Sequence, residues 1–159
     1  MSDIFFSRLK PGLIFDLGSY TFEAHAIKDF AHKFDPQPFH MDETAAKQSH
    51  FGGLCASGWH VCAIFMKLNV ANGDEALLSA TGWTGPLPER GPSPGLRDLQ
   101  WRCPTYAGDT LTYRSTLTEA RHTQSRPGWG LMQTEVEATN QNDESVMLFQ
   151  SAVFLRSDT

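Results

Sequence analysis

Cysteine is scarce in this sequence, and its few copies form no recognisable pair. The chain has 159 residues and three cysteines, Cys55, Cys62 and Cys103, with no Cys-x-x-Cys spacing. An odd number without close pairs argues against a disulfide-stapled scaffold and against a zinc ribbon. The six histidines also lack any His-x-His or His-x-x-x-His pair. We therefore expect no metal site.

Basic clusters and long apolar segments are missing as well. Lys and Arg number 13 against 18 Asp and Glu, a formal net charge of -5, so we expect no nucleic-acid partner. The longest apolar run, residues 59–70, is too short to cross a bilayer and contains Lys67. Residues 1–8 have neither the basic start nor the apolar core of a signal peptide. These features predict a soluble, cytoplasmic protein without a membrane partner.

The chain is uniform enough to predict a single unit of structure. No repeat, low-complexity tract or linker interrupts it, and 40% of its residues are hydrophobic. That share is sufficient for a packed core. The length then predicts one domain that spans residues 1–159.

Hydrophobic spacing predicts helices in the first half of the chain. Residues 27–34 place apolar side chains at intervals of three and four, which predicts a short helix. Residues 42–47 predict another, and residues 19–25 alternate like a strand. The longest helix is expected at residues 57–70, with Ser57 as its N-cap. Because apolar residues cover nearly its whole circumference, we expect this helix to be buried.

The second half of the chain has the pattern of strands joined by short turns. Strands are expected at residues 76–84, 96–103, 110–122, 129–139 and 145–156. Short connections favour antiparallel neighbours. The prediction is an α+β fold in which a curved antiparallel sheet wraps around one long buried helix. Such a sheet leaves an edge or outer face free, and dimerisation is a common way to cover it.

The most informative stretch carries an acid and a base on a stiff segment. Asp35 and His40 lie five residues apart, and Pro36 and Pro38 fall between them. Proton transfer needs both groups within hydrogen-bond reach of one substrate, and the prolines would hold them in place. Spacing alone favours a second interpretation, in which Asp35 caps a turn and His40 is a satisfied core histidine.

Several blocks of the sequence match one known family. The chain resembles the MaoC-like dehydratases, in the (R)-specific enoyl-CoA hydratase branch of the hotdog fold, over nearly its whole length. The matching blocks are Phe-Asp-Pro-Gln-Pro-Phe-His-Met-Asp at 34–42, Phe-Gly-Gly-Leu-Cys-Ala-Ser-Gly at 51–58, Leu-Gln-Trp-Arg-Cys-Pro at 99–104, Ala-Gly-Asp-Thr-Leu at 107–111 and Ser-Arg-Pro-Gly at 125–128. The first block is specific, and the later ones are mainly structural turns.

The resemblance implies a reaction and a set of residues. In this family the aspartate and histidine of the first block bind and activate water, which here implies Asp35 and His40. A backbone N–H at the start of the central helix polarises the thioester carbonyl, which implies Gly58. The implied substrate is an acyl-CoA, with no cofactor, and the implied assembly is a homodimer or a higher homo-oligomer. The residues implied in substrate binding are Phe39, Gly53, Ser57 and Trp59.

Two departures from the family pattern and two competing functions remain. Ser57 stands where many members have histidine, and Met66 where some have serine, so the acyl pocket is expected to differ in shape. Hotdog thioesterases commonly carry Asp or Glu on the central helix, as do the similar acyl-carrier-protein dehydratases. Residues 57–70 contain neither acid, which argues against both functions. A thioesterase and a non-catalytic acyl-CoA-binding protein are kept as alternatives.

Arginine side chains are candidates for contacts with the phosphates of CoA. The four candidates, each of which fits a solvated surface position better, are Arg90, Arg97, Arg102 and Arg126. The tryptophans Trp83, Trp101 and Trp129 fit core or interface positions, and no functional role is predicted for them.

Overall fold

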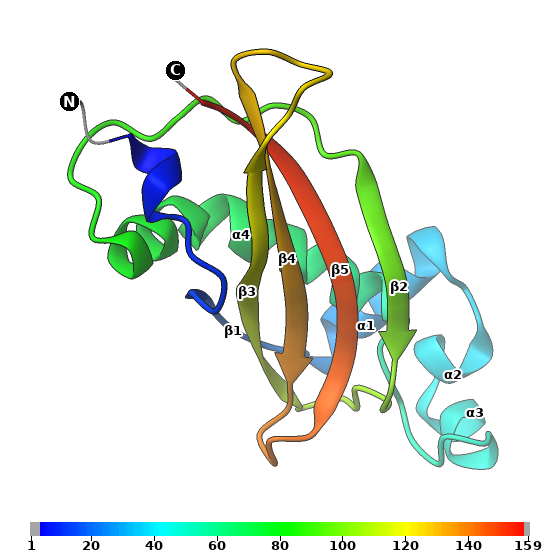
Figure 1. The fold of residues 1–159 in the computed structure, drawn as a ribbon. Coiled ribbons are helices and arrows are strands. Elements are labelled where there is room, and N and C mark those ends of the chain that lie inside the picture. The colour runs from blue at the N-terminus through cyan, green and yellow to red at the C-terminus, as the bar shows by residue number, and fades with distance from the viewer. Residues whose placement is uncertain (1–3, 158–159) are drawn as a thin grey trace.

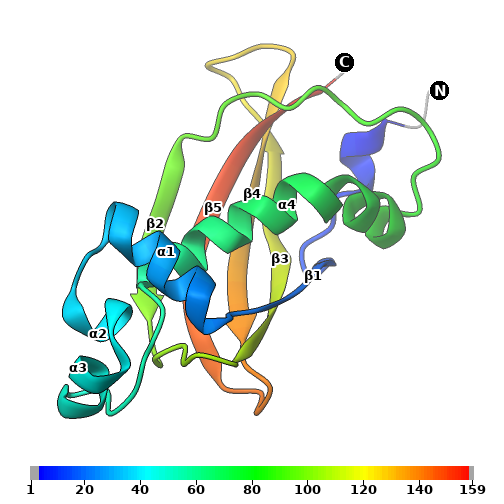
Figure 2. The same ribbon diagram turned by 180° about the vertical axis from the view of Figure 1, so that it is seen from behind.

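A curved five-stranded antiparallel sheet forms the body of the computed structural model, and one long helix crosses its concave face (Figures 1 and 2). The structure describes residues 4–157; the ends of the predicted domain, 1–3 and 158–159, lie outside the described residues. The strand order is β1-β3-β4-β5-β2. The elements are a 3₁₀ helix (Phe5–Arg8), β1 (Ile14–Thr21), α1 (Ala24–Phe34), α2 (Pro38–Met41), α3 (Glu43–Gln48), α4 (Gly58–Thr81), β2 (Gly95–Trp101), β3 (Thr110–His122), β4 (Trp129–Thr139) and β5 (Ser145–Arg156).

The prediction of a curved antiparallel sheet around a long helix is confirmed. The bounds of β3, β4 and β5 coincide with the predicted strands, and β2 lies within two residues of its prediction. On β3, Leu111, Tyr113 and Leu117 are buried on the face toward α4, as period-two alternation requires. The long strands thus present an apolar surface on which the helix packs.

Two predicted strands are wrong in whole or in part. Residues 76–84 were expected as a strand, but α4 continues through them to Thr81. Alanine and leucine dominate this stretch and favour a helix, and Ala76 and Leu77 pack into the core. The helix ends at Gly82, whose φ of 63° is the left-handed conformation of a C-cap. The predicted strand 19–25 is shifted, because β1 covers Ile14–Thr21 and α1 already begins at Ala24.

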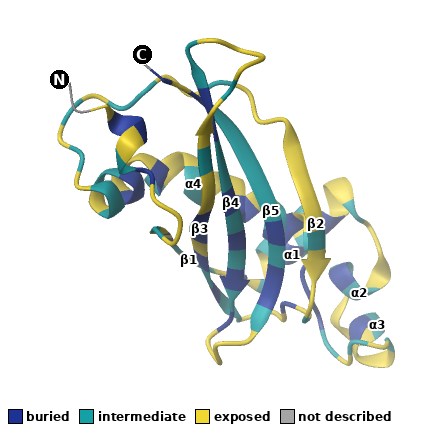
Figure 3. Cartoon of the chain, in the orientation of Figure 1, coloured by how far each residue is buried: buried dark blue, intermediate teal, exposed yellow. Residues whose placement is uncertain are grey.

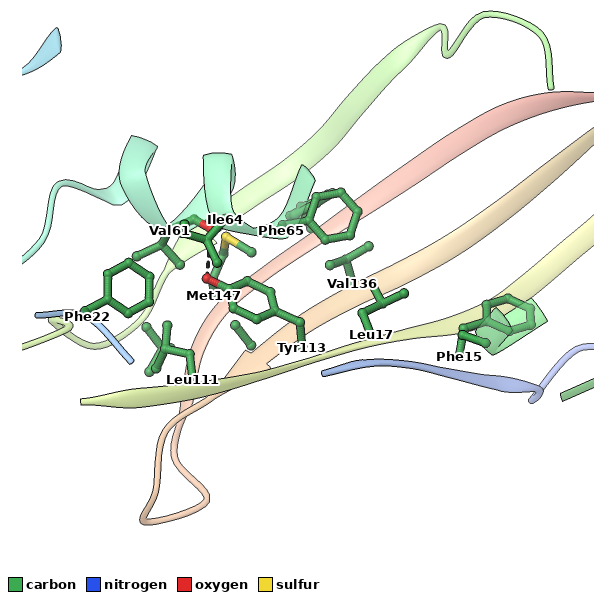
Figure 4. Close-up of a cluster of buried hydrophobic side chains, with 14 of the residues drawn as sticks. Phe15, Leu17, Phe22, Val61, Ile64, Phe65, Leu111, Tyr113, Val136 and Met147 are labelled. Carbon is green, nitrogen blue, oxygen red and sulfur yellow. Dashed lines mark hydrogen bonds between the residues drawn. The ribbon is translucent and has the colours of Figure 1, made fainter. Parts of the chain in front are cut away.

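Helix α4 is buried on the side that faces the sheet. Figure 4 shows Val61, Ile64 and Phe65 pointing into the same apolar cluster as Tyr113 and Met147. The buried Tyr113 hydroxyl donates a hydrogen bond of 2.9 Å to the carbonyl of Val61, which fixes the first turns of α4 against the sheet.

The opposite face of α4 is open, so the prediction of an entirely buried helix is wrong for this single chain. Trp59, Met66 and Val70 are exposed large apolar residues on this helix. The edge strand β2 is exposed along most of its length (Figure 3). Within residues 4–157, no helix is both long and apolar enough to cross a membrane.

Candidate active site

The acid and the base are brought together by the end of one helix and the short helix that follows. Asp35 is the C-cap of α1, and its N–H donates to the carbonyl of Ala31 at 2.8 Å. Pro36 ends α1, since the residue before a proline avoids the helical region. Pro38 then occupies the first turn of α2, where its missing N–H costs nothing. His40 lies in the last turn of α2, only five residues after Asp35.

Asp35 and His40 face each other across a short gap. The His40 Nε2 atom lies 3.3 Å from Oδ2 of Asp35, and the two side chains are 7% and 17% exposed. The other carboxylate oxygen, Oδ1, accepts a 2.7 Å hydrogen bond from the side-chain amide of Gln37. The pair is therefore held in position and largely shielded from bulk water.

A backbone carbonyl sets the tautomer of the imidazole. His40 Nδ1 lies 2.6 Å from the carbonyl oxygen of Cys55, and a carbonyl can only accept. Nδ1 therefore carries a proton, and a neutral ring has its lone pair on Nε2. That lone pair faces the Asp35 carboxylate, which is also an acceptor. A protonated ring would donate from Nε2 directly to Oδ2, whereas beside the neutral ring a water molecule with two O–H bonds could donate to both acceptors.

The carboxyl group of Asp35 is ionised at neutral pH. Burial raises its pKa, but hydrogen bonds from Ser57 and Gln37, together with the positive charge that His40 carries when it is protonated, lower it by more, so the pKa is below its ordinary value of 3.8. Ser57 is itself 1% exposed. The site therefore offers a fixed negative charge beside the imidazole.

The third predicted catalytic residue, Gly58, lies at the positive end of α4. Ser57 is the N-cap, as predicted, and its hydroxyl accepts a 3.3 Å hydrogen bond from the N–H of Trp59. Within residues 4–157 the N–H of Gly58 has no acceptor. An unpaired donor at the start of a 24-residue helix favours a negative charge in front of it.

All three groups line one cavity of ≈ 610 Å³. Of the residues predicted to bind substrate, Phe39, Ser57 and Trp59 also line it, whereas Gly53 does not. The ring of Tyr106 fills the space beside Gly53 instead. The other residues that line the cavity include His50, Phe51, Trp101, Arg102, Pro104 and Tyr106.

Sequence reasoning assigned no role to Trp101 and named Arg102 only as one of four candidate arginines. Trp101, for which no role was predicted, lines the cavity; its orientation depends on a backbone irregularity in β2 that no sequence motif marks. Among the four candidate arginines, only Arg102 reaches the cavity. Arg90 is paired with Asp74, and Arg126 lies over the ring of Phe154.

A second buried histidine lies near the site but does not line the cavity. His60 stacks on Phe30, with ring centroids 4.6 Å apart, and its Nδ1 has no hydrogen-bond partner within the described chain. Burial lowers its pKa from 6.5 to about 4. His60 is therefore neutral at pH 7 and acts as a packing residue. Within residues 4–157, no three His, Cys, Asp or Glu side chains cluster as a metal site would require.

Comparisons with known proteins identify the family to which the chain belongs. Residues 10–149 match the family described as FAS1-like, dehydratase domain region. A MaoC-like dehydratase from Rhodospirillum rubrum is 35% identical, with a TM-score of 0.77 over 96% of this chain and 97% of that one. An (R)-hydratase from A. caviae involved in PHA biosynthesis shares the fold, at 20% identity and a TM-score of 0.64 over 91% of this chain and 96% of that one.

A further relative is matched over only part of its length. The uncharacterized protein YdeM of Bacillus subtilis is 39% identical over 62 residues, which are 39% of this chain and 44% of that protein. The family of the chain follows from the family match over residues 10–149 and from the Rhodospirillum rubrum dehydratase, which matches over 96% of the chain. The chain belongs to the FAS1-like, MaoC-like dehydratases of the hotdog fold.

Proposed function

We propose that the protein is an (R)-specific enoyl-CoA hydratase, which adds water reversibly to a trans-2-enoyl thioester and removes it from a 3-hydroxyacyl thioester. The observation that carries the proposal is the approach of His40 Nε2 to Asp35 Oδ2, 3.3 Å apart in a cavity, where both atoms are acceptors when the imidazole is neutral. A pair of this kind is suited to hold one water molecule by both of its protons.

The proposed reaction is a proton relay centred on that water. Its oxygen bonds to C3 of the enoyl group while His40 Nε2 accepts one of its protons. Asp35 orients the water and stabilises the imidazolium that forms, because it is ionised and accepts hydrogen bonds. The imidazolium then donates a proton to C2. The net change adds H to C2 and OH to C3, so the reaction needs neither a redox cofactor nor a metal.

The free N–H of Gly58 supports the second half of this chemistry. As the oxygen of water adds to C3, negative charge moves to the thioester oxygen and an enolate forms. A preorganised donor at that oxygen stabilises the transition state more than the ground state. The partial positive charge of the α4 N-terminus acts in the same direction.

The proposal extends to the substrate carrier and the assembly. Arg102, at the cavity wall, is suited to contact a phosphate of CoA. The exposed apolar residues Trp59, Met66 and Val70 on α4 form a surface that a second copy of the chain would cover in a homodimer. The cytoplasmic location and the absence of a cofactor stay predictions.

An assay of hydration separates this function from its competitors. The loss of conjugated enoyl absorbance is measured with trans-2-enoyl-CoAs of increasing length, for the wild type, His40→Ala and His32→Ala. His32 is an exposed imidazole on α1 and serves as the matched control. We expect hydration by the wild type and by His32→Ala, and a rate at least about a hundredfold lower for His40→Ala, as for a general base. Release of free CoA thiol without hydration would instead identify a thioesterase. Absence of both hydration and thiol release would favour a non-catalytic binding protein.

A further inference from the structure

The edge strand β2 contains an irregularity that changes the direction of one large side chain. Arg97 pairs with Gln150 of β5, and Gln100 pairs with Leu148. Two residues of β2 therefore lie opposite one residue of β5, which is a β-bulge. Asp98 stands in the bulge with a φ of 55°, a left-handed conformation that aspartate tolerates better than most residues.

The bulge places Trp101 on the concave face of the sheet. Simple alternation would put Leu96 and Trp101 on opposite faces, because their positions differ by an odd number. With the extra residue, Leu96 pairs with Ser151 and Trp101 pairs with Met147. Met147 is fully buried beneath α4, so Trp101 faces the same side. Bulges beside functional sites commonly re-aim a side chain in this way.

Once re-aimed, the indole of Trp101 lies directly against the start of α4. A Cβ added to Gly58 would stand 2.6 Å from Cδ2 and 2.8 Å from Nε1 of Trp101. The rings of Trp59 and Trp101 meet edge to face with centroids 5.0 Å apart. The indole thus forms the wall beside the proposed oxyanion donor, although Trp101 as a whole is 43% exposed.

Contacts beneath the indole separate the active-site cavity from a second one. Cys62 lies one turn along α4 from Gly58, and its thiol contacts the sulfur of Met147 at 3.5 Å. One further turn along α4, the ring of Phe65 meets that of Phe149. Beyond this point lies a cavity of ≈ 270 Å³, lined mainly by apolar residues that include Phe65, Met66, Val70, Leu77 and Val153. Trp101 lines the active-site cavity and its indole is hydrogen-bonded to the thiol of Cys62, so it forms part of the barrier between the reacting centre and this apolar space.

We infer that Trp101 is a specificity-determining residue whose indole limits the length of the acyl group, and that its removal gives longer chains room beside the start of α4. This inference rests on the proposed function, because it takes the thioester carbonyl to lie at Gly58. Trp101 touches the acyl group but takes no part in the transfer of protons.

The test compares the binding of unreactive saturated thioesters, so that it does not depend on turnover. Dissociation constants of butanoyl-CoA and octanoyl-CoA are measured by calorimetry for the wild type, Trp101→Ala and Trp101→Phe. Trp129→Phe is the control, because Trp129 opens β4 and lines neither of the two cavities. One methylene in an apolar pocket changes selectivity about tenfold or more. The preference for octanoyl-CoA should therefore rise at least about tenfold in Trp101→Ala, less in Trp101→Phe, and not in Trp129→Phe.

The outcomes separate this inference from the function beneath it. An unchanged preference in Trp101→Ala, with butanoyl-CoA still bound, overturns the role of Trp101 alone. Failure of every variant to bind either thioester overturns the proposed function and this inference with it. Binding with the expected shift but without hydration by the wild type overturns the hydratase activity and leaves the role of Trp101 standing. Because Trp101→Phe keeps an aromatic ring at the position, a graded response also excludes general loss of structure as its cause.

Discussion

The indole of Trp101 occupies the space that any side chain at position 58 would need. Its Cδ2 atom lies 2.6 Å from the place where a Cβ on Gly58 would stand. Gly58→Ala keeps the backbone N–H, and alanine favours a helix more than glycine does. We nevertheless expect Gly58→Ala to lower kcat/KM for a short enoyl-CoA at least about tenfold, because about 1.4 kcal/mol of misplaced transition-state contact suffices for that loss.

A double substitution shows whether the contact is the cause. In the Trp101→Ala background the added methyl group has room, so Gly58→Ala should cost there no more than about twofold. Contacting residues show such coupling in a double-mutant cycle. If Gly58→Ala costs the same with and without the indole, the steric explanation is wrong.

Arg102 is expected to act on binding of the carrier and not on chemistry. It lines the cavity, and its Nε donates a 3.1 Å hydrogen bond to Gln100. Arg102→Ala should raise KM for an enoyl-CoA about tenfold at low salt, with kcat little changed, because a charge-assisted hydrogen bond to phosphate is lost. The effect should shrink as salt is added. Arg97→Ala is the control, because Arg97 is a nearby arginine on β2 that does not line the cavity; an equal effect there would remove Arg102 from the site.

The buried imidazole of His60 should make the fold sensitive to acid. Its pKa is about 4 in the folded chain against 6.5 for a free histidine. As the pH falls through 6.5 the unfolded chain binds the proton first, so stability declines between pH 6.5 and 4 and is fully present above that window. The shift corresponds to a loss on the order of 3 kcal/mol.

Replacement of that imidazole tests the acid sensitivity. His60→Phe keeps a ring against Phe30, with which His60 stacks at 4.6 Å. Urea unfolding at pH 7.5 and pH 4.5 should show a smaller loss of stability for His60→Phe than for the wild type. His32→Gln, an exposed histidine on α1, should behave as the wild type does. Parallel losses in all three proteins would mean that His60 is not the group that titrates.

The sequence predicted the parts of the structure that local patterns control. Alternation located β3, β4 and β5, and the two prolines after Asp35 indicated where α1 stops. The acid and base of the first motif do meet, at 3.3 Å. The resemblance to a family was needed to prefer catalysis, because spacing alone favoured a turn and a core histidine.

The errors fall where tertiary contacts decide. Residues 76–84 carry no breaker before Gly82, and burial of Ala76 and Leu77 extends α4 through them. Gly73 lies buried within α4 and does not interrupt it. The face of the sheet on which the Trp101 side chain lies depends on a bulge at Asp98. One added residue in a strand reverses which side chains point inward. Such a register change leaves no trace in hydrophobic spacing.

The central claim is that Asp35 and His40 act together on one water molecule, and a double-mutant cycle tests it most directly. The kcat for hydration of a trans-2-enoyl-CoA is measured for Asp35→Asn, His40→Ala and the double variant, with circular dichroism to verify the fold. Groups that work as a unit are strongly non-additive. Each single change should lower kcat at least about a hundredfold, and the double variant should be no slower than the slower single variant within about threefold. Losses that multiply, to about ten-thousandfold or more, would show that the two side chains act independently and would contradict the account.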